Sequence, residues 1–235
     1  MAKSSEAYDR LKSDILRAII APGTPLVVAG LKERYGLGWT PLREALSRLE
    51  IEGLVVLEHN RGYRVAPVSA GAIRDLQLAR RTVEETLLRR SIESGDANWE
   101  AGIVAEHHRL SRTPSPAPGI DEAGMTLWEE RHDAFHGALL AAGRSESLTR
   151  FQRQITEQLQ RHHRHMLFDP AARQELDPQA QPSFGDLVER TLGLAHHTRL
   201  MEAALDRDTD RAVALLVEHI GFSLAVYAFL WPLEA

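Results

Sequence analysis

The spacing of hydrophobic residues divides the chain into two regions of different character. In roughly the first 67 residues, short helical patterns are followed by two short runs of aliphatic and β-branched residues. From about Ser69 onward, apolar residues recur at three- and four-residue steps, and no alternating strand pattern is present. The patterns therefore predict a mainly α protein with two domains, residues 1–69 and residues 70–235.

The N-terminal region begins with three predicted helices. Apolar residues at helical spacing predict helices over residues 6–20 and 27–35. A third helix is predicted from Thr40, which can act as its N-cap, with Pro41 at the favoured first position, to Gly53.

Two predicted strands follow, over residues 54–57 and 63–65, with a tip between them at residues 59–62. Three helices and a two-stranded wing are the parts of a winged helix-turn-helix. The third helix would then enter the major groove of DNA, which is about 12 Å wide.

The C-terminal region predicts an all-helical bundle. Six segments show helical periodicity: residues 70–95, 97–111, 122–143, 145–168, 183–205 and 208–230. A proline-rich connector at residues 113–119 and a polar, proline-containing loop at residues 169–182 interrupt them.

The composition is that of an ordinary globular protein, with 43% hydrophobic and 26% charged residues. No apolar run approaches the 20 or so residues that a membrane helix needs. Residues 1–10 are polar and lack the apolar core of a signal peptide. Cysteine is absent, which excludes disulfides and thiolate ligands. We therefore expect a cytoplasmic protein that has no membrane partner.

Charge is distributed unevenly between the two regions. The chain carries a net charge of −5, yet residues 1–69 hold ten basic and eight acidic residues. The N-terminal region therefore has a net charge of +2, and the remainder carries −7. A basic N-terminal region followed by an acidic C-terminal region is compatible with nucleic-acid binding but does not establish it.

The start of the third predicted helix is the candidate DNA-reading element. Its N-terminus offers unpaired backbone N–H groups, and Arg43 offers a positive charge, both of which suit phosphate. Arg43 could instead pair with Glu44 or Glu50 and solvate the helix. Trp39 could stack on a sugar or a thymine methyl group, or cover the hydrophobic core.

Residues 8–66 resemble the GntR family of bacterial regulators. Pro22-Gly23-Thr24-Pro25-Leu26 is similar to the family's PGxxL stretch, and the seven residues from Thr40 to Leu46 are similar to its TPVREAL core. The segment Asn60-Arg61-Gly62-Tyr63-Arg64-Val65 is similar to its wing. The resemblance implies DNA contacts at Thr40, Arg43, Arg48, Arg61 and Gly62, and Trp39 is a further candidate beside them.

The resemblance also has departures. Gly38 and Trp39 stand where the family usually has Ser-Arg, and Ala29 stands where it often has a basic residue. Direct readout of DNA at these positions therefore has to differ from the family pattern.

Eleven histidines are present, and four of them have suggestive spacing. His132 and His136 are four residues apart and share one helical face. His197 and His219 lie on successive predicted helices that could run antiparallel. Neutral imidazoles from three helices would suit Zn²⁺ or a similar divalent ion, although a lone helical histidine is more often a surface or core residue.

Residues 70–228 resemble the FCD domain of the FadR-like branch of GntR regulators. Phe135-His136 with the following Gly137-Ala138-Leu139-Leu140 is similar to its FHxxLxxA core, and the stretch from His197 to His219 is similar to its second histidine motif. This resemblance implies a bundle of six or seven helices that forms a homodimer. It also implies a divalent metal, Zn with Mn or Ni as alternatives, held by one Asp and three His.

The position of the family's Asp is occupied here by His132, and Asp133 is its neighbour. Successive residues point about 100° apart around a helix, so the two side chains cannot face one metal equally. We expect the ligands to be His132, His136, His197 and His219, with Asp133 as the alternative to His132.

Arginines are the candidate effector ligands, because a guanidinium binds carboxylates bidentately. Arg80 and Glu84 are similar to the family's RxxLE helix start, and Arg153 and Arg161 lie eight residues apart on one predicted helix. The basic cluster at residues 161–165 could form an anion pocket or a solvated helix face. We expect a small organic acid to bind Arg80 and Arg153.

The function predicted from these features is a DNA-binding transcription regulator, a repressor released from operator DNA by a small carboxylate. A metal-dependent hydrolase with an accessory domain is the alternative, since an open metal position could activate water. No histidine motif is accompanied by a convincing general base, so we expect the protein not to be an enzyme. A purely structural helical protein would leave Arg43 and the Gly62 wing tip unexplained.

Overall fold

The computed structural model describes residues 2–115, 121–168 and 181–230. These residues form two compact units. The first contains the chain up to Leu76 and continues with helix α7 from Arg153, and the second contains residues from Gln77 to Gln152 and the C-terminal helices. Helix α7 therefore contributes residues to both units.

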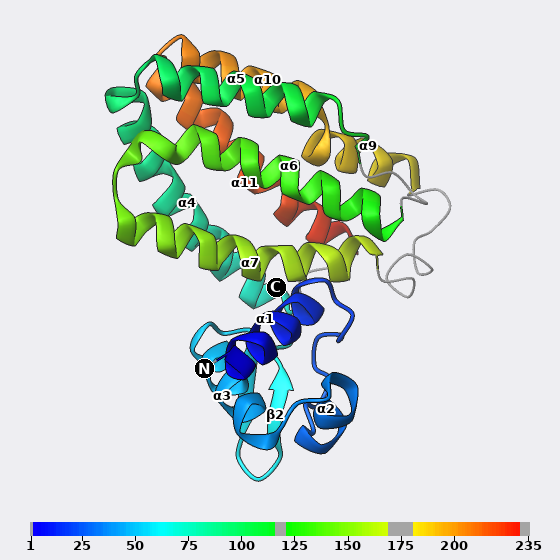
Figure 1. The fold of residues 1–235 in the computed structure, drawn as a ribbon. Helices are drawn as coiled ribbons and strands as arrows, with labels where there is room; N and C mark the ends of the chain where they lie inside the picture. The colour runs from blue at the N-terminus through cyan, green and yellow to red at the C-terminus, as the bar shows by residue number, and fades with distance from the viewer. Residues whose placement is uncertain (1, 116–120, 169–180, 231–235) are drawn as a thin grey trace. The chain divides into compact units, whose positions relative to one another are not determined.

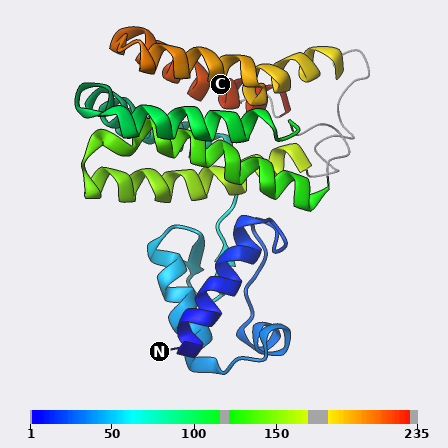
Figure 2. The ribbon, with the colours of Figure 1, turned by 45° about the horizontal axis from the view of Figure 1, so that its top comes forward.

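The N-terminal part of the first unit, up to Val65, consists of three helices and a two-stranded sheet (Figure 1). Its elements are α1 (Ala2–Leu16), α2 (Val28–Tyr35), α3 (Trp39–Ile51), β1 (Val55–Glu58) and β2 (Gly62–Val65). The strands are antiparallel, with Val55 opposite Val65. Helix α1 packs on α3, as Figure 2 shows within this unit. Leu11, Leu42 and Leu46 are fully buried between them, so apolar burial holds the recognition helix in place.

Two predicted boundaries in this unit are wrong. The first helix ends at Leu16 instead of residue 20, because Ala18 adopts a left-handed φ of 56° that a helix cannot continue through. Helix α3 begins at Trp39 with Gly38 as its N-cap, so Thr40 is not the cap. Pro41 is still accommodated, because N–H groups in the first turn have no intrahelical partner to lose.

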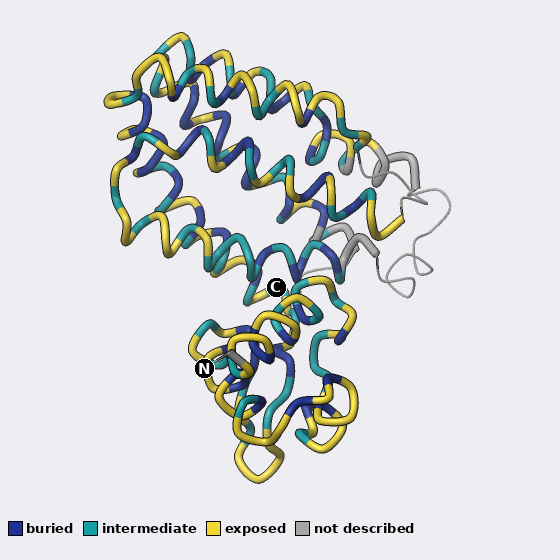
Figure 3. Tube along the Cα trace, viewed as in Figure 1, coloured by how far each residue is buried: buried dark blue, intermediate teal, exposed yellow. Residues whose placement is uncertain are grey.

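The second unit is a helical bundle with one hydrophobic core cluster, and Figure 3 marks where buried residues lie along its helices. Its own helical elements are α5 (Ala97–Ser111), α6 (Glu122–Leu140), the 3₁₀ turn η1 (Ala141–Gly143), α9 (Gln181–Leu192), α10 (Leu194–Leu205) and α11 (Thr209–Leu230). It shares two further helices with the first unit, α4 (Ala70–Ser94) and α7 (Glu146–Phe168). Phe135, Ile103 and Leu200 are fully buried in its core. Within the described ranges, no helix combines the length and apolar character needed to cross a membrane.

The predicted helix over residues 183–205 is in fact two helices that meet at Gly193. The Gly193 N–H donates to the Glu189 carbonyl at 2.7 Å, and a Cβ on residue 193 would lie 2.3 Å from that same oxygen. Only glycine fits such a close approach. The helix predicted over 122–143 also ends early, at Leu140, and continues as η1. Residues 169–180 of the predicted loop at 169–182 lie outside the described residues. The same holds for residues 116–119 of the predicted proline-rich connector.

Helix α7 contributes polar contacts to the first unit. Gln158 Nε2 donates to the Glu52 carbonyl just after α3 at 2.5 Å, and Lys12 bridges the Glu52 and Glu157 carboxylates. Arg161, only 2% exposed, donates to the Ala66 carbonyl at 2.5 Å and to Gln158. The basic cluster at 161–165 is therefore not a solvated helix face, since its arginine is used to hold the end of the wing.

Candidate metal centre and nucleic-acid interface

Four histidine side chains from three helices meet inside the second unit. His132 and His136 come from α6, His197 from α10 and His219 from α11. One ring nitrogen from each lies within 4.8 Å of the corresponding nitrogens of the others. His136, His197 and His219 are buried, and His132 is partly buried.

The hydrogen bonds of two of these rings leave the lone pair on the nitrogen that faces the cluster. His197 Nδ1 lies 2.8 Å from the Gly193 carbonyl, which can only accept, so this nitrogen carries the proton and Nε2 carries the lone pair. His132 Nδ1 lies 3.4 Å from the Asp133 carboxylate, which favours the same tautomer. Among the described residues, the converging nitrogens have no hydrogen-bond partner: His132 Nε2, His136 Nε2, His197 Nε2 and His219 Nδ1.

Burial keeps all four imidazoles neutral. It lowers the pKa of His132 to about 3, an effect to which the charge of Arg80 adds. Burial also lowers the pKa of His197 to about 3, and His132 beside it contributes. The pKa values of His136 and His219 lie well below the ordinary histidine value for the same main reason. Protons therefore do not compete with a cation for these nitrogens near pH 7.

This donor set fits a divalent transition metal. Zn–N bonds of about 2.0–2.1 Å place tetrahedral ligand atoms about 3.4 Å apart, and small side-chain rotations would bring the four nitrogens to that separation. Asp133 is not part of the cluster, and its carboxylate, 43% exposed, contacts the Nδ1 side of His132. Of the two alternatives at this position, the structure brings His132 together with the other three histidines.

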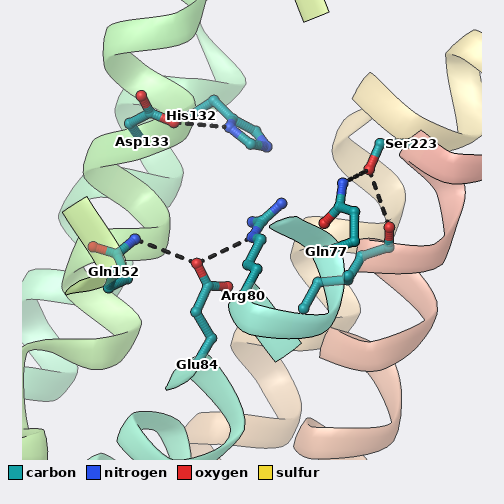
Figure 4. Close-up of polar contacts among 8 residues, drawn as sticks. Gln77, Arg80, Glu84, His132, Asp133, Gln152 and Ser223 are labelled. Atoms are coloured by element: carbon teal, nitrogen blue, oxygen red, sulfur yellow. Dashed lines mark hydrogen bonds and ion pairs between the residues drawn. The ribbon is translucent and has the colours of Figure 1, made fainter. Parts of the chain in front are cut away.

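Arg80 lies beside the histidine cluster. In Figure 4 its guanidinium extends from α4 toward His132. Its Nε donates to Glu84 Oε1 at 3.0 Å, and Gln152 Nε2 reaches the same oxygen at 3.3 Å. Arg153, the other predicted effector ligand, is exposed and belongs to the first unit.

Sequence reasoning missed two polar residues beside Arg80. Gln77 precedes Arg80 by three residues on the same face of α4, and it donates to Ser223 at 2.5 Å. Ser223 follows His219 by four residues on α11. In the sequence, only their three- and four-residue spacing from Arg80 and His219 could have indicated that they lie near the site. Gln and Ser occur so often on helices that this spacing alone does not single them out.

His196, next to His197, has a structural environment. It is buried, its Nε2 donates to the Leu215 carbonyl at 2.8 Å, and Arg199 donates to its Nδ1 at 2.9 Å. Both nitrogens are therefore used, and the ring stacks on His219 with centroids 5.5 Å apart. It supports His219 without offering a ligand atom.

The first turn of α3 presents an exposed surface in the first unit. Trp39 is 53% exposed, so it does not cover the core, and Thr40 and Arg43 are also exposed. Within the described residues no ion pair joins Arg43 to Glu44 or Glu50, and Glu44 instead accepts from Ser4. Arg43 is therefore available for a phosphate or a base.

Arg48 has a different environment from Arg43. Its guanidinium lies 3.7 Å from the centroid of the Tyr8 ring, a cation–π contact that ties α3 to α1. At the wing tip, Arg61 is 76% exposed on its side chain, and Gly62 has a φ of 79°. Arg64 turns inward and donates to the Gly23 carbonyl. Of these arginines, Arg61 is the one that the wing exposes.

Comparison with known proteins agrees with this architecture. Residues 3–65 match the family model described as bacterial regulatory proteins, gntR family, and residues 75–222 match the FCD domain. The chain therefore belongs to the GntR family of DNA-binding transcription regulators, in which the helix-turn-helix is followed by an FCD effector-binding domain.

Relatives of similar length carry the same description. The HTH-type transcriptional repressor GlaR of Escherichia coli K12 is 35% identical over 218 residues, which are 92% of each chain. The HTH-type transcriptional regulator BphR of Paraburkholderia xenovorans LB400 is 32% identical over 219 residues, 93% of this chain and 82% of that one.

Solved structures share the fold at low identity. A GntR regulator from Rhodococcus sp. RHA1 superimposes with a TM-score of 0.69 at 19% identity and covers 100% of both chains. E. coli McbR/YncC gives a TM-score of 0.67 at 17% identity over 99% of this chain and 98% of the other.

Proposed function

We propose that this regulator is a homodimeric, cytoplasmic repressor that senses a small organic acid through a metal held by His132, His136, His197 and His219. The observation that carries the proposal is the convergence of four buried ring nitrogens that have no other partner in the described structure. Leaving such groups buried and unpaired is costly, and a divalent cation would satisfy all four at once. Zn²⁺ is the first choice for an imidazole set, with Mn²⁺ and Ni²⁺ as alternatives.

The effector is a carboxylate in this proposal. A bound metal would supply a Lewis-acidic position for a carboxylate oxygen. Arg80 would orient the same anion, because Glu84 engages its Nε and no described partner takes its two Nη groups. The −7 net charge of the C-terminal region gives no long-range attraction for an anion, so these local contacts have to supply the affinity.

Operator recognition would use the exposed surface of the first unit. Arg43 and Thr40 would contact DNA from α3, Trp39 would replace the family's arginine by apolar contact, and Arg61 with Gly62 would contact DNA from the wing. Arg48 is the weakest member of this set, since Tyr8 already engages it. A dimer would read two related half-sites, and the name of the relative GlaR, a repressor, supports repression.

Hydrolysis at the same centre is less well supported. The carboxylates beside the cluster, Glu84 and Asp133, are engaged by Arg80 and His132. Each of these carboxylates already has a partner on one oxygen, which makes both poor candidates for a general base.

The decisive experiment is a DNA-shift titration with the operator, carried out with zinc-loaded protein, with and without a panel of small organic acids. We expect an acid to release the DNA and a chelator to weaken that response. Operator binding that responds to no acid in either state would contradict the proposal.

A further inference from the structure

Two buried hydrogen-bond acceptors near Arg80 have no donor among the described residues. They are Gln77 Oε1 and Glu84 Oε2, on side chains from residues that are 2% and 0% exposed. Both residues lie on the face of α4 that carries Arg80, since positions 77, 80 and 84 are spaced three and four residues apart.

The neighbouring hydrogen bonds determine which polar atom of each side chain has no hydrogen-bond partner in the described part of the chain. Ser223 donates its only hydroxyl proton to the Ile220 carbonyl at 3.0 Å, so it can only accept from Gln77. Gln77 therefore turns Nε2 toward Ser223, as Figure 4 shows, and its oxygen is left without a donor. At Glu84, Arg80 and Gln152 share Oε1, and Oε2 is left over.

We propose that the effector carries a hydroxyl group as well as its carboxylate, and that one of these two acceptors, Gln77 Oε1 or Glu84 Oε2, accepts its single proton. This inference rests on the proposed function. A carboxylate alone can satisfy Arg80 and the metal position, but it has no proton to give to these acceptors. A hydroxy acid supplies that donor, and an acid without the hydroxyl leaves a buried acceptor unpaired.

The charges around the acceptors favour a hydroxyl over an ammonium group. Arg80 already neutralises Glu84 at 3.0 Å. An ammonium would add a second positive charge beside the guanidinium and the metal position, and like charges at short range repel strongly when water is excluded. A neutral hydroxyl donor meets no such penalty.

The test is calorimetric binding of matched acids to the zinc-loaded full chain: lactate against propionate, malate against succinate, and 2-hydroxyglutarate against glutarate, with aspartate as the amino counterpart. In any pair that binds, we expect the hydroxy acid to bind about tenfold or more tightly than its parent. Equal affinities within the pairs would overturn this inference and leave the proposed function standing. Absence of binding by every acid would overturn both, and a clear preference for aspartate would overturn the choice of hydroxyl.

The residue assignment is tested by Gln77→Met, which keeps the side-chain length and removes the acceptor. In this variant we expect the ratio of hydroxy-acid affinity to parent-acid affinity to fall several-fold, while the affinity for the parent acid stays unchanged. The matched control is Glu85→Gln, since Glu85 pairs with Arg81 one position further along α4, as Glu84 pairs with Arg80. An unchanged preference in Gln77→Met would remove Gln77 from the site, and if that variant does not fold, the wild-type pairs still decide whether a hydroxyl is read.

Discussion

Convergence of the ring nitrogens, and not burial alone, separates the histidines that form the cluster from the others. His136 and His197 are 3% and 0% exposed and direct a nitrogen into the cluster, whereas His108 lies exposed on α5. Sequence spacing together with the family resemblance already grouped the four histidines that the structure brings together, because histidines four apart on a helix share a face. It could not choose between His132 and Asp133, since that choice depends on the rotation of α6 about its own axis.

Removing one cluster histidine should remove the metal. We expect His136→Ala, His197→Ala and His219→Ala each to lower bound zinc from about one ion per subunit to a small fraction of that, because three imidazoles with an empty position hold zinc less tightly. Metal analysis after loading and desalting measures this, with His108→Ala as the exposed control. Full metal content in the His197 variant would exclude the four-histidine centre.

The arginines of α3 should divide into a DNA contact and a structural contact. We expect Arg43→Ala to weaken operator binding by about 1–3 kcal/mol without changing thermal stability, as is typical when a base-reading arginine is lost. Arg48→Ala should instead cost about 0.5–1 kcal/mol of stability, since it removes the contact with Tyr8. Binding titrations and thermal unfolding of both variants separate the roles, and unchanged operator affinity in Arg43→Ala would remove it from the interface.

The buried imidazoles should make the metal-free protein sensitive to acid. Histidines of the unfolded chain titrate near pH 6.5, whereas burial lowers the pKa of His132 and of His197 to about 3 in the folded state. Between these values the unfolded chain binds protons that the folded chain does not, so stability present above pH 6.5 is lost as the pH falls toward 3. Urea unfolding with a chelator should show a lower free energy of unfolding at pH 5 than at pH 7.5. His132→Gln should reduce that difference and His108→Ala should not; a difference that neither variant changes would speak against these histidines as its source.

At the scale of elements, local signals predicted helices well and their interruptions poorly. Helix α5 was predicted over residues 97–111 and has those bounds, and the Asp96 side chain caps it by accepting from Asn98 and Trp99. The break at Gly193 was missed because glycine within a helical pattern is tolerated. Its necessity arises only from the approach of the Glu189 carbonyl, which the sequence does not show.

That break has a functional consequence, because the Gly193 carbonyl accepts from His197 Nδ1. We expect Gly193→Ala to shift the α9–α10 junction, since a Cβ there would lie 2.3 Å from a backbone oxygen. The His197 ring would lose its orientation, and zinc affinity should fall roughly 10- to 100-fold, as for other outer partners of metal ligands. Gly102→Ala, on an α5 site with open space around a Cβ, is the control. Zinc titration that finds equal affinity in the Gly193 variant would show that the junction does not orient the ligand.

At the scale of the whole molecule, α7 is the element that sequence reasoning assigned least completely. Its periodicity predicted a bundle helix, and residues up to Gln152 do belong to the bundle unit. From Arg153 its residues belong instead with the helix-turn-helix, where Gln158 and Arg161 bind backbone carbonyls more than 90 residues away in the sequence. Contacts of such separation leave no local pattern, so they could not be predicted.

For the proposed effector signal, α7 is the candidate route, because its residues belong to both units. Gln152, which contacts Glu84, and Gln158, which contacts the residue that follows α3, are less than two helical turns apart. An acid bound at Arg80 is expected to change the Arg80–Glu84–Gln152 contacts and so the operator affinity. By thermodynamic linkage, the acid changes the affinity for operator DNA by the same factor by which operator DNA changes the affinity for the acid. Coupling of about 1–3 kcal/mol is typical, so we expect a 5- to 150-fold effect in both directions. The measurement is a calorimetric titration of the acid into free protein and into the protein–operator complex. The same pair of titrations is repeated with Gln152→Ala and, as the control, with Arg150→Ala, because Arg150 is an exposed residue of α7. We expect Gln152→Ala to reduce the difference between the two titrations, and Arg150→Ala to preserve it. Equal affinities of the wild type in the two titrations would mean that the acid is not the signal, however tightly it binds.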